Sequence, residues 1–229
     1  MPLQSVVVLP PGPPTEHELR LPARPGPISL DRISPSDRLV LAELAGNARV
    51  AIEVGTFLGG SAETMLQAMP ADGVLLTVDT FGGTLGTETQ AVPGNIVLEY
   101  AVSRLGPYKD RSVVIVGDSR VVSGFIGNET ADLIFIDAAH DYANVKADIE
   151  AWLPKLKADG VFAGHDMGKW FRILTGEQII EKSGGEVDRE TQLHCGVIRA
   201  VIESFEKVKL LGDYGSTIWS VEKGWLRHE

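Results

Sequence analysis

The stretch from residue 131 to residue 166 constrains the fold of this chain more than any other. It opens with the apolar run from Leu133 to Ile136, which is typical of a strand buried on both faces, and closes with a second strand from Val161 to Ala163. Between them, apolar residues recur every three or four positions over 142–156, which predicts a helix that stops at Asp159-Gly160. A strand, helix and strand joined in this way place their two strands parallel.

Acidic residues follow both strands of this unit. Asp137 follows the first strand, and Asp166 follows the second with His165 immediately before it. Parallel strands end at the same edge of a sheet, and open α/β sheets bind their ligands at that edge. We therefore expect Asp137 and Asp166 to lie close together, with His140 above the same edge.

The rest of the chain continues this alternation of strands and helices. Further strands are predicted over 50–54, 74–78, 113–116, 208–211 and 217–221, and further helices over about 36–44, 60–69, 177–182 and 197–206, with others ending near 105 and 126. The pattern predicts an α/β fold of the Rossmann-like, doubly wound kind. Its mostly parallel, seven-stranded sheet is covered on both faces and ends in an antiparallel last strand.

Prolines set the start of the chain apart. Eight prolines between residues 10 and 35 exclude a regular helix or a central strand there. We predict a proline-rich N-terminal arm over 1–35 and a single α/β domain over 36–229, with Ser36 capping its first helix. The apolar residues 6–9 lack the basic flank and the length of a signal peptide or a membrane span. The arm is either a tail without fixed structure or a segment that packs on a neighbouring subunit of a homo-oligomer.

Charge and cysteine content narrow the range of partners. The chain has 31 acidic and 21 basic residues, a formal charge of -10, and no run of Lys or Arg. This balance argues against nucleic acids and membranes as partners and favours a small molecule. The single cysteine, Cys195, excludes an internal disulfide and a site built from several thiolates, and indicates a cytoplasmic location.

Polar residues at three other strand ends predict a binding site for a nucleoside-like ligand. The glycine-containing segment from Glu53 to Ser61 lets the backbone approach a ligand, but it lacks the G-x-G-x-x-G spacing of dinucleotide sites. Asp79 ends the next strand, where a carboxylate can bind both hydroxyls of a ribose. Asp118 and Ser119 end the third strand, where the base attached to that ribose would lie.

Together, these motifs resemble those of class I S-adenosylmethionine-dependent O-methyltransferases. They are EVGTFLGGS at 53–61, VDT at 78–80, VGDS at 116–119, IDAAHDY at 136–142 and GVFAGHD at 160–166. More narrowly, the chain resembles the metal-dependent group that contains catechol O-methyltransferase and the macrocin-type sugar O-methyltransferases. The resemblance covers 49–166 well and 195–222 loosely.

The resemblance implies a set of cofactor-binding residues. Around the methionine part of S-adenosylmethionine it places Glu53, Gly55, Thr56, Gly59 and Ser61. It assigns Asp79 to the ribose, Asp118 and Ser119 to the adenine, and Asp137 to both the cofactor and a divalent metal.

The implied metal ligands are Asp137 and Asp166, with Mg²⁺ as the expected cation. The family usually carries a carboxylate where this chain has His165, so His165 either is a third ligand or points away. As a ligand it would shift the preference towards Mn²⁺ or another transition metal, such as Fe²⁺ or Zn²⁺. His140 matches the position of a Lys in the catechol enzymes and a His in the sugar enzymes, and titration near neutral pH would suit it as the catalytic base.

The expected function is therefore metal-dependent methylation of a small-molecule hydroxyl, such as that of a sugar or another natural product. A nicotinamide-dependent oxidoreductase is one alternative, and a noncatalytic or hydroxylase-related cofactor-binding protein of the same fold is another. His194 and Cys195 fall in a segment expected near the site, where ordinary packing is the favoured interpretation.

Overall fold

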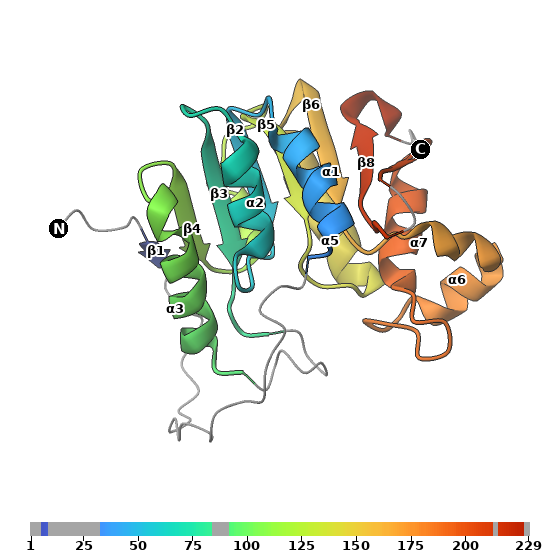
Figure 1. Cartoon of the computed structure of the whole chain (residues 1–229). Helices are drawn as coiled ribbons and strands as arrows, with labels where there is room; N and C mark the ends of the chain where they lie inside the picture. Colours follow the sequence, from blue (N-terminus) through green and yellow to red (C-terminus); the bar gives the residue numbers. More distant parts are fainter. Residues whose placement is uncertain (1–5, 9–32, 84–91, 213–214, 227–229) are drawn as a thin grey trace.

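The computed structural model describes residues 6–8, 33–83, 92–212 and 215–226 (Figure 1). Most of the predicted arm, residues 84–91 of a segment rich in glycine and threonine that starts at Gly82, and residues 213–214 lie outside these ranges. The strands are β1 (Val6–Val8), β2 (Val50–Val54), β3 (Val74–Asp79), β4 (Ser112–Val116), β5 (Ala131–Ile136), β6 (Leu156–Gly164), β7 (Lys209–Leu210) and β8 (Trp219–Glu222). The α-helices are α1 (Pro35–Ala45), α2 (Gly60–Ala68), α3 (Gly94–Leu105), α4 (Ser119–Ser123), α5 (Tyr142–Trp152), α6 (Gly176–Lys182) and α7 (Cys195–Ser204).

The sheet has the strand order β1-β4-β3-β2-β5-β6-β8-β7. Strands β1 to β6 pair in parallel, and β8 pairs antiparallel with both β6 and β7. The predicted seven-stranded, mostly parallel sheet with its antiparallel strand is therefore confirmed. One short edge strand extends it, because Val6–Val8 of the arm pair with Val114–Val116. These β-branched residues precede the prolines of residues 10–35, so their backbone is free to join a ladder.

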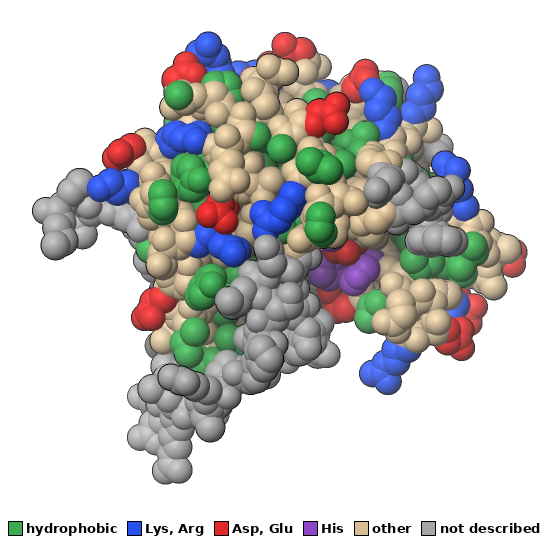
Figure 2. All heavy atoms as spheres, in the orientation of Figure 1, with side chains coloured by type: hydrophobic (Ala, Val, Ile, Leu, Met, Phe, Trp, Pro, Cys, Tyr) green, Lys and Arg blue, Asp and Glu red, His purple; other side chains and the backbone are tan. Residues whose placement is uncertain are grey.

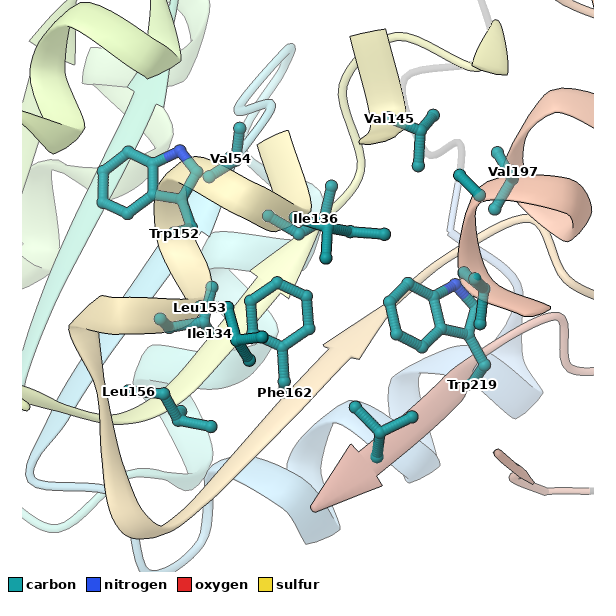
Figure 3. Packing of buried hydrophobic residues seen from close by; sticks show 14 of the residues in the cluster. Val54, Ile134, Ile136, Val145, Trp152, Leu153, Leu156, Phe162, Val197 and Trp219 are labelled. Carbon is teal, nitrogen blue, oxygen red and sulfur yellow. The ribbon is translucent and has the colours of Figure 1, made fainter. Parts of the chain in front are cut away.

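Helices cover both faces of the sheet, and each face has its own core. On the face visible in Figure 1, side chains of α1, α2 and α3 pack on the sheet around Leu41, Met65 and Leu105. On the other face, α5 and α7 pack around Trp152 and other large side chains, shown in Figure 3. Burying each such side chain contributes about 1.5–3 kcal/mol. Since both faces are covered, ligands reach the sheet only along its edges.

The helix of the central unit ends earlier than the sequence indicates. We expected it to run to residue 156 and to stop at Asp159-Gly160, but α5 ends at Trp152 and a 3-10 turn over Leu153–Lys155 follows. Pro154 explains the difference, because proline has no N–H to bond the preceding turn and its ring clashes with the carbonyl group four residues earlier. Strand β6 then starts at Leu156, and the Asp159-Gly160 pair lies within it, where its register with β5 shifts.

Helix α1 is capped by Ser34 instead of Ser36. The Ser34 hydroxyl accepts the Asp37 N–H at 3.0 Å, and Pro35 occupies the first turn. Proline suits that position because its missing N–H would have no partner within the helix. None of the helices in the described ranges combines the length and the apolar composition needed to cross a bilayer.

Candidate active site

A cavity of about 780 Å³ opens along the carboxyl ends of the parallel strands. Each strand from β2 to β6 contributes the residues that follow it, and the segment between α6 and α7 closes one side. Figure 2 shows histidine and acidic side chains gathered in a hollow of the surface. The predicted site residues that line the cavity are Gly55, Thr56, Ser61, Asp79, Asp118, Ser119, Asp137, His140, His165 and Asp166.

Two of the predicted cofactor residues, Glu53 and Gly59, are absent from this lining. Glu53 is fully buried, and the hydroxyls of Ser61 and Thr77 donate to its carboxyl oxygens. It therefore contacts the cavity lining through the hydroxyl of Ser61. Gly59 begins α2 with a positive φ of 75°, which favours glycine. Their roles beside the methionine part remain predictions.

Burial raises the pKa of Glu53 to about 8, although the hydroxyl donors oppose the shift. In the unfolded chain this carboxyl ionises near its ordinary pKa of 4.5. The stability that depends on a neutral Glu53 is therefore fully present only below about pH 4.5. This contribution declines as the pH rises from about 4.5 to about 8, at about 1.4 kcal/mol per pH unit at most.

We expect Glu53→Gln, which mimics the neutral carboxyl, to be more stable than the wild type at pH 8 and similar to it at pH 4.5. The measurement is chemical unfolding of both proteins across this range, with the exposed Glu43→Gln as control. A difference between Glu53→Gln and wild type that does not vary with pH would show that Glu53 is ionised in the folded protein.

Asp79 organises the loop that follows β2. Its carboxylate accepts the backbone N–H groups of Thr56, Phe57 and Phe81 at 2.7–2.9 Å. Gly55 precedes this loop with φ 98°, and a Cβ there would lie 1.9 Å from the carbonyl oxygen of Asp137. Only glycine fits where β2 and β5 end side by side, so the predicted ribose and metal positions are held in one rigid framework.

The predicted adenine region includes a residue that sequence reasoning missed. Asp118 caps α4 and forms an ion pair with Arg120 at 2.8 Å. The hydroxyl of Ser119 donates to Asp148 of α5, which is buried beside the cavity and whose pKa is raised to about 6 by that burial. Asp148 lies next to Ile149 on the helix, and its position among core residues is the signal that could have drawn attention to it.

The three predicted metal ligands come together. Nδ1 of His165 lies 3.2 Å from Oδ1 of Asp166 and 3.8 Å from Oδ1 of Asp137. One possible ligand atom from each of the three residues lies within 4.8 Å of the other two. Asp166 follows β6 with a positive φ of 66°, which is uncommon for a residue other than glycine. Two carboxylates and one imidazole are donors that suit a divalent cation.

Asp37 of α1 contacts His165 at Nε2, the ring nitrogen other than the one that faces Asp137 and Asp166. Nε2 of His165 lies 3.2 Å from Oδ2 of Asp37 and 2.9 Å from the hydroxyl of Thr217. Burial alone would raise the pKa of Asp37, but the hydrogen bonds from His165 and Ser34 lower it to about 2. Asp166 and Asp137, with a smaller contribution from Asp37, raise the pKa of His165 well above its usual value, against the effect of its own burial. Nothing in the sequence places Asp37, 128 residues from His165, at this site.

His140 lies among three carboxylates. Its Nε2 is 2.9 Å from Oδ2 of Asp166 and 3.9 Å from Oδ1 of Asp137, and its Nδ1 is 2.9 Å from Oε2 of Glu186. Burial would lower the pKa of His140, but hydrogen bonds with these carboxylates raise it to about 12. The expectation of titration near neutral pH is thus wrong for the metal-free protein, because Asp137 and Asp166, together with Glu186, stabilise the protonated imidazole.

The segment between α6 and α7 supplies Glu186 and a third histidine. His194 lies at the start of α7, its ring 4.5 Å from that of His140, and its Nε2 is 3.5 Å from Oδ1 of Asp166. It lines the cavity, so this segment lies near the site as expected. The packing interpretation holds for Cys195, since its side chain is fully buried.

The Rossmann-like sheet, with a polar cavity at the carboxyl ends of its strands, agrees with the fold expected from the resemblance to class I methyltransferases. The family described as "Methyltransferase domain" matches residues 52–167, just over half of the chain. The chain belongs to this methyltransferase family. The resemblance found in the sequence is confirmed at that level, and the nicotinamide-dependent alternative has no support.

Individual relatives agree with this family. A protein from Mycolicibacterium vanbaalenii, provisionally named an O-methyltransferase, is 38% identical over 100 residues, which are 44% of this chain and 39% of that protein. The match thus spans well under half of the relative's length.

Two solved structures share the fold. An O-methyltransferase from Bacillus cereus, in complex with SAH, has a TM-score of 0.57 and 22% identity, with 85% of this chain and 84% of that chain covered. The O-methyltransferase TomG from Streptomyces achromogenes, involved in tomaymycin synthesis and in complex with SAM, has a TM-score of 0.57 and 17% identity, with 83% and 81% covered.

Proposed function

We propose that this chain transfers the methyl group of S-adenosylmethionine to a hydroxyl of a small molecule and uses a divalent cation to do so. The observation that carries the proposal is the juxtaposition of two carboxylates and a histidine, Asp137, Asp166 and His140, in the cavity that also contains Asp79 and Asp118. The O-methyltransferase relatives with SAM or SAH bound support the cofactor.

In this proposal one end of the cavity binds the cofactor. Asp79 accepts hydrogen bonds from the ribose, and the loop that it holds supports the methionine part. Asp118 and Ser119 lie where the adenine would bind. Fixing the sulfonium in this way supplies the alignment that methyl transfer between sulfur and oxygen requires.

The other end holds the acceptor. Asp137, Asp166 and His165 fit a divalent cation, which when bound would polarise the acceptor hydroxyl and lower its pKa. His140 accepts the hydroxyl proton at Nε2 as the oxygen–methyl bond forms and the sulfur–methyl bond breaks. Glu186 keeps Nδ1 occupied and so directs Nε2 towards the two aspartates. Two of the three carboxylates that retain the proton on His140, Asp137 and Asp166, are expected to bind the cation, so cation binding favours the neutral imidazole that a base requires.

Two observations support a class of acceptor. A sugar or another natural product fits the resemblance to macrocin-type enzymes, and TomG's role in tomaymycin synthesis supports a natural product. The cytoplasmic location rests on the single cysteine, and assembly through the N-terminal arm remains a proposal. Deletion of residues 1–30 with an unchanged elution volume would contradict that assembly.

The cofactor assignment is tested with Asp79→Ala. We expect loss of charge-assisted hydrogen bonds worth about 1.5–3 kcal/mol, which is about 10- to 150-fold weaker binding of S-adenosylmethionine by calorimetry. Asp72→Ala, which removes an exposed carboxylate, is the matched control and should bind normally. Because Asp79 also holds three backbone N–H groups, thermal unfolding must show that the variant is folded. Unchanged affinity in a folded Asp79→Ala protein would remove Asp79 from the ribose site.

A further inference from the structure

The carboxyl group of Asp148 is buried beside the predicted adenine region. Asp148 belongs to α5, is only 4% exposed, and lines the cavity together with Asp118 and Ser119. The hydroxyl of Ser119 donates to its Oδ1. Among the residues that the structure describes, none donates a hydrogen bond to its other oxygen, Oδ2. A buried carboxyl oxygen without a donor is unfavourable, so Oδ2 is the atom that a donor on a ligand in the cavity would satisfy.

Asp118, the carboxylate that the resemblance assigns to the adenine, already has donors at both of its oxygens. Oδ1 accepts the backbone N–H of Arg120 at 2.9 Å and its Nε–H at 3.2 Å, and Oδ2 accepts Nη2 of the same residue at 2.8 Å. These bonds cap α4 and pair the carboxylate with a cation. A donor on the adenine would compete with them at Asp118, but would meet no competing donor from the described residues at Oδ2 of Asp148.

The adenine base carries a donor that suits this oxygen. Its 6-amino group has two hydrogens, and an ionised carboxylate can only accept. Burial raises the pKa of Asp148 to about 6, so the group is ionised at pH 7.5. A purine with a carbonyl oxygen in place of the amino group would bring two acceptors together at Oδ2 and leave both without a hydrogen. The bond from Ser119 occupies Oδ1 and so leaves Oδ2 for the ligand.

We propose that Asp148 accepts a hydrogen bond from the 6-amino group of the adenine and thereby selects adenosyl compounds over their 6-oxo analogues. Ser119 then acts as a positioning residue, because it holds the other oxygen of Asp148. The inference rests on the proposed function, since it takes the end of the cavity at Asp79, Asp118 and Ser119 as the cofactor site. It adds a specificity-determining residue on α5, outside the strand-end motifs that carry the resemblance.

The test compares S-adenosylhomocysteine with S-inosylhomocysteine, in which a carbonyl oxygen replaces the 6-amino group, by calorimetry at pH 7.5. We expect the wild type to bind the adenosyl compound at least about tenfold more tightly. Asp148→Asn keeps an acceptor for Ser119 but replaces Oδ2 by an amide donor, so the ratio of the two affinities should fall at least about tenfold. Glu150→Gln, an exposed carboxylate on the same helix, is the control and should keep the wild-type ratio.

The ratio separates base recognition from a structural role, because a distorted site would weaken the binding of both compounds alike. Thermal unfolding shows whether each variant is folded. If Asp148→Asn does not fold, Ser119→Ala provides the second test, because loss of the bond that positions Asp148 should lower the ratio at least about threefold.

The possible outcomes distinguish this inference from the proposed function. A wild type that binds both compounds equally, an unchanged ratio in folded Asp148→Asn, or a ratio that falls only in Asp118→Asn would overturn the role of Asp148 and leave the proposed function standing. An unchanged ratio in Ser119→Ala, where Asp148→Asn does not fold, would overturn it as well. Failure of the wild type to bind S-adenosylhomocysteine would contradict the proposed function and this inference with it.

Discussion

Removal of divalent metal ions is expected to abolish methyl transfer at saturating S-adenosylmethionine and acceptor. A cation that polarises the acceptor oxygen lowers the barrier to methyl transfer by several kcal/mol, so EDTA should lower the rate by at least about 10³-fold. Without the cation, the carboxylates around His140 also keep that base protonated. The rate is measured by conversion of labelled S-adenosylmethionine with one accepted hydroxyl substrate, and returning the metal in excess over EDTA should restore it.

Asp137→Ala tests the same metal dependence by removing a proposed metal ligand. The side chain of Asp137 is partly exposed, and its ion-pair distances to His140 and His165 are 3.8–3.9 Å, so its loss should leave the chain folded. We expect a folded protein that lacks both activity and metal dependence. A variant that fails to fold would favour a structural role for Asp137. Full wild-type activity in EDTA would remove the metal from the mechanism.

His140→Ala is expected to have the second largest effect, a loss of about 10²–10⁴-fold in rate with nearly unchanged affinity for S-adenosylmethionine. The reason is that Nε2 of His140, 2.9 Å from Asp166, is the basic atom placed beside the proposed acceptor. Part of the loss should be recovered at higher pH, since a hydroxyl polarised by the cation can ionise without the base.

A pH–rate profile of wild type and His140→Ala, at saturating cofactor and metal, provides the measurement for this prediction. Glu190→Gln serves as the control for changes in the neighbouring segment. A His140→Ala protein as fast as the wild type at neutral pH would exclude His140 as the base. Metal binding by the wild type without methyl transfer to any hydroxyl would instead support the noncatalytic alternative.

The sheet and the residues at its strand ends could be predicted because both follow from local pattern. Apolar runs mark parallel strands, and the carboxyl ends of such strands meet at one edge, so the sequence alone predicts that Asp79, Asp118, Asp137 and Asp166 lie together. All four line the cavity. The boundaries of α5 and β6 were less accurate, because Pro154 acts within a periodic pattern that continues beyond it.

Residues that reach the site from distant segments could not be predicted. Asp37 arrives on α1, and Glu186 and His194 arrive on the segment between α6 and α7, where no strand fixes their position. The pKa of His140 was misjudged because its hydrogen bonds with Asp137, Asp166 and Glu186 depend on distances that the sequence does not give. Glu53 illustrates another limit, because its carboxyl is buried between the sheet and α2, where Thr77 and Ser61 donate to it, while the sequence places it in a ligand-binding motif.

The most direct test of a metal-dependent O-methyltransferase is a crystal structure of the protein soaked with S-adenosylmethionine and a transition ion, with anomalous data collected for the metal. We predict the ribose at Asp79, the adenine beside Asp118 and Ser119, and one anomalous peak coordinated by Asp137, His165 and Asp166 with the sulfonium methyl group facing it. A cavity without the cofactor, or a metal peak away from these three residues, would contradict the proposed function.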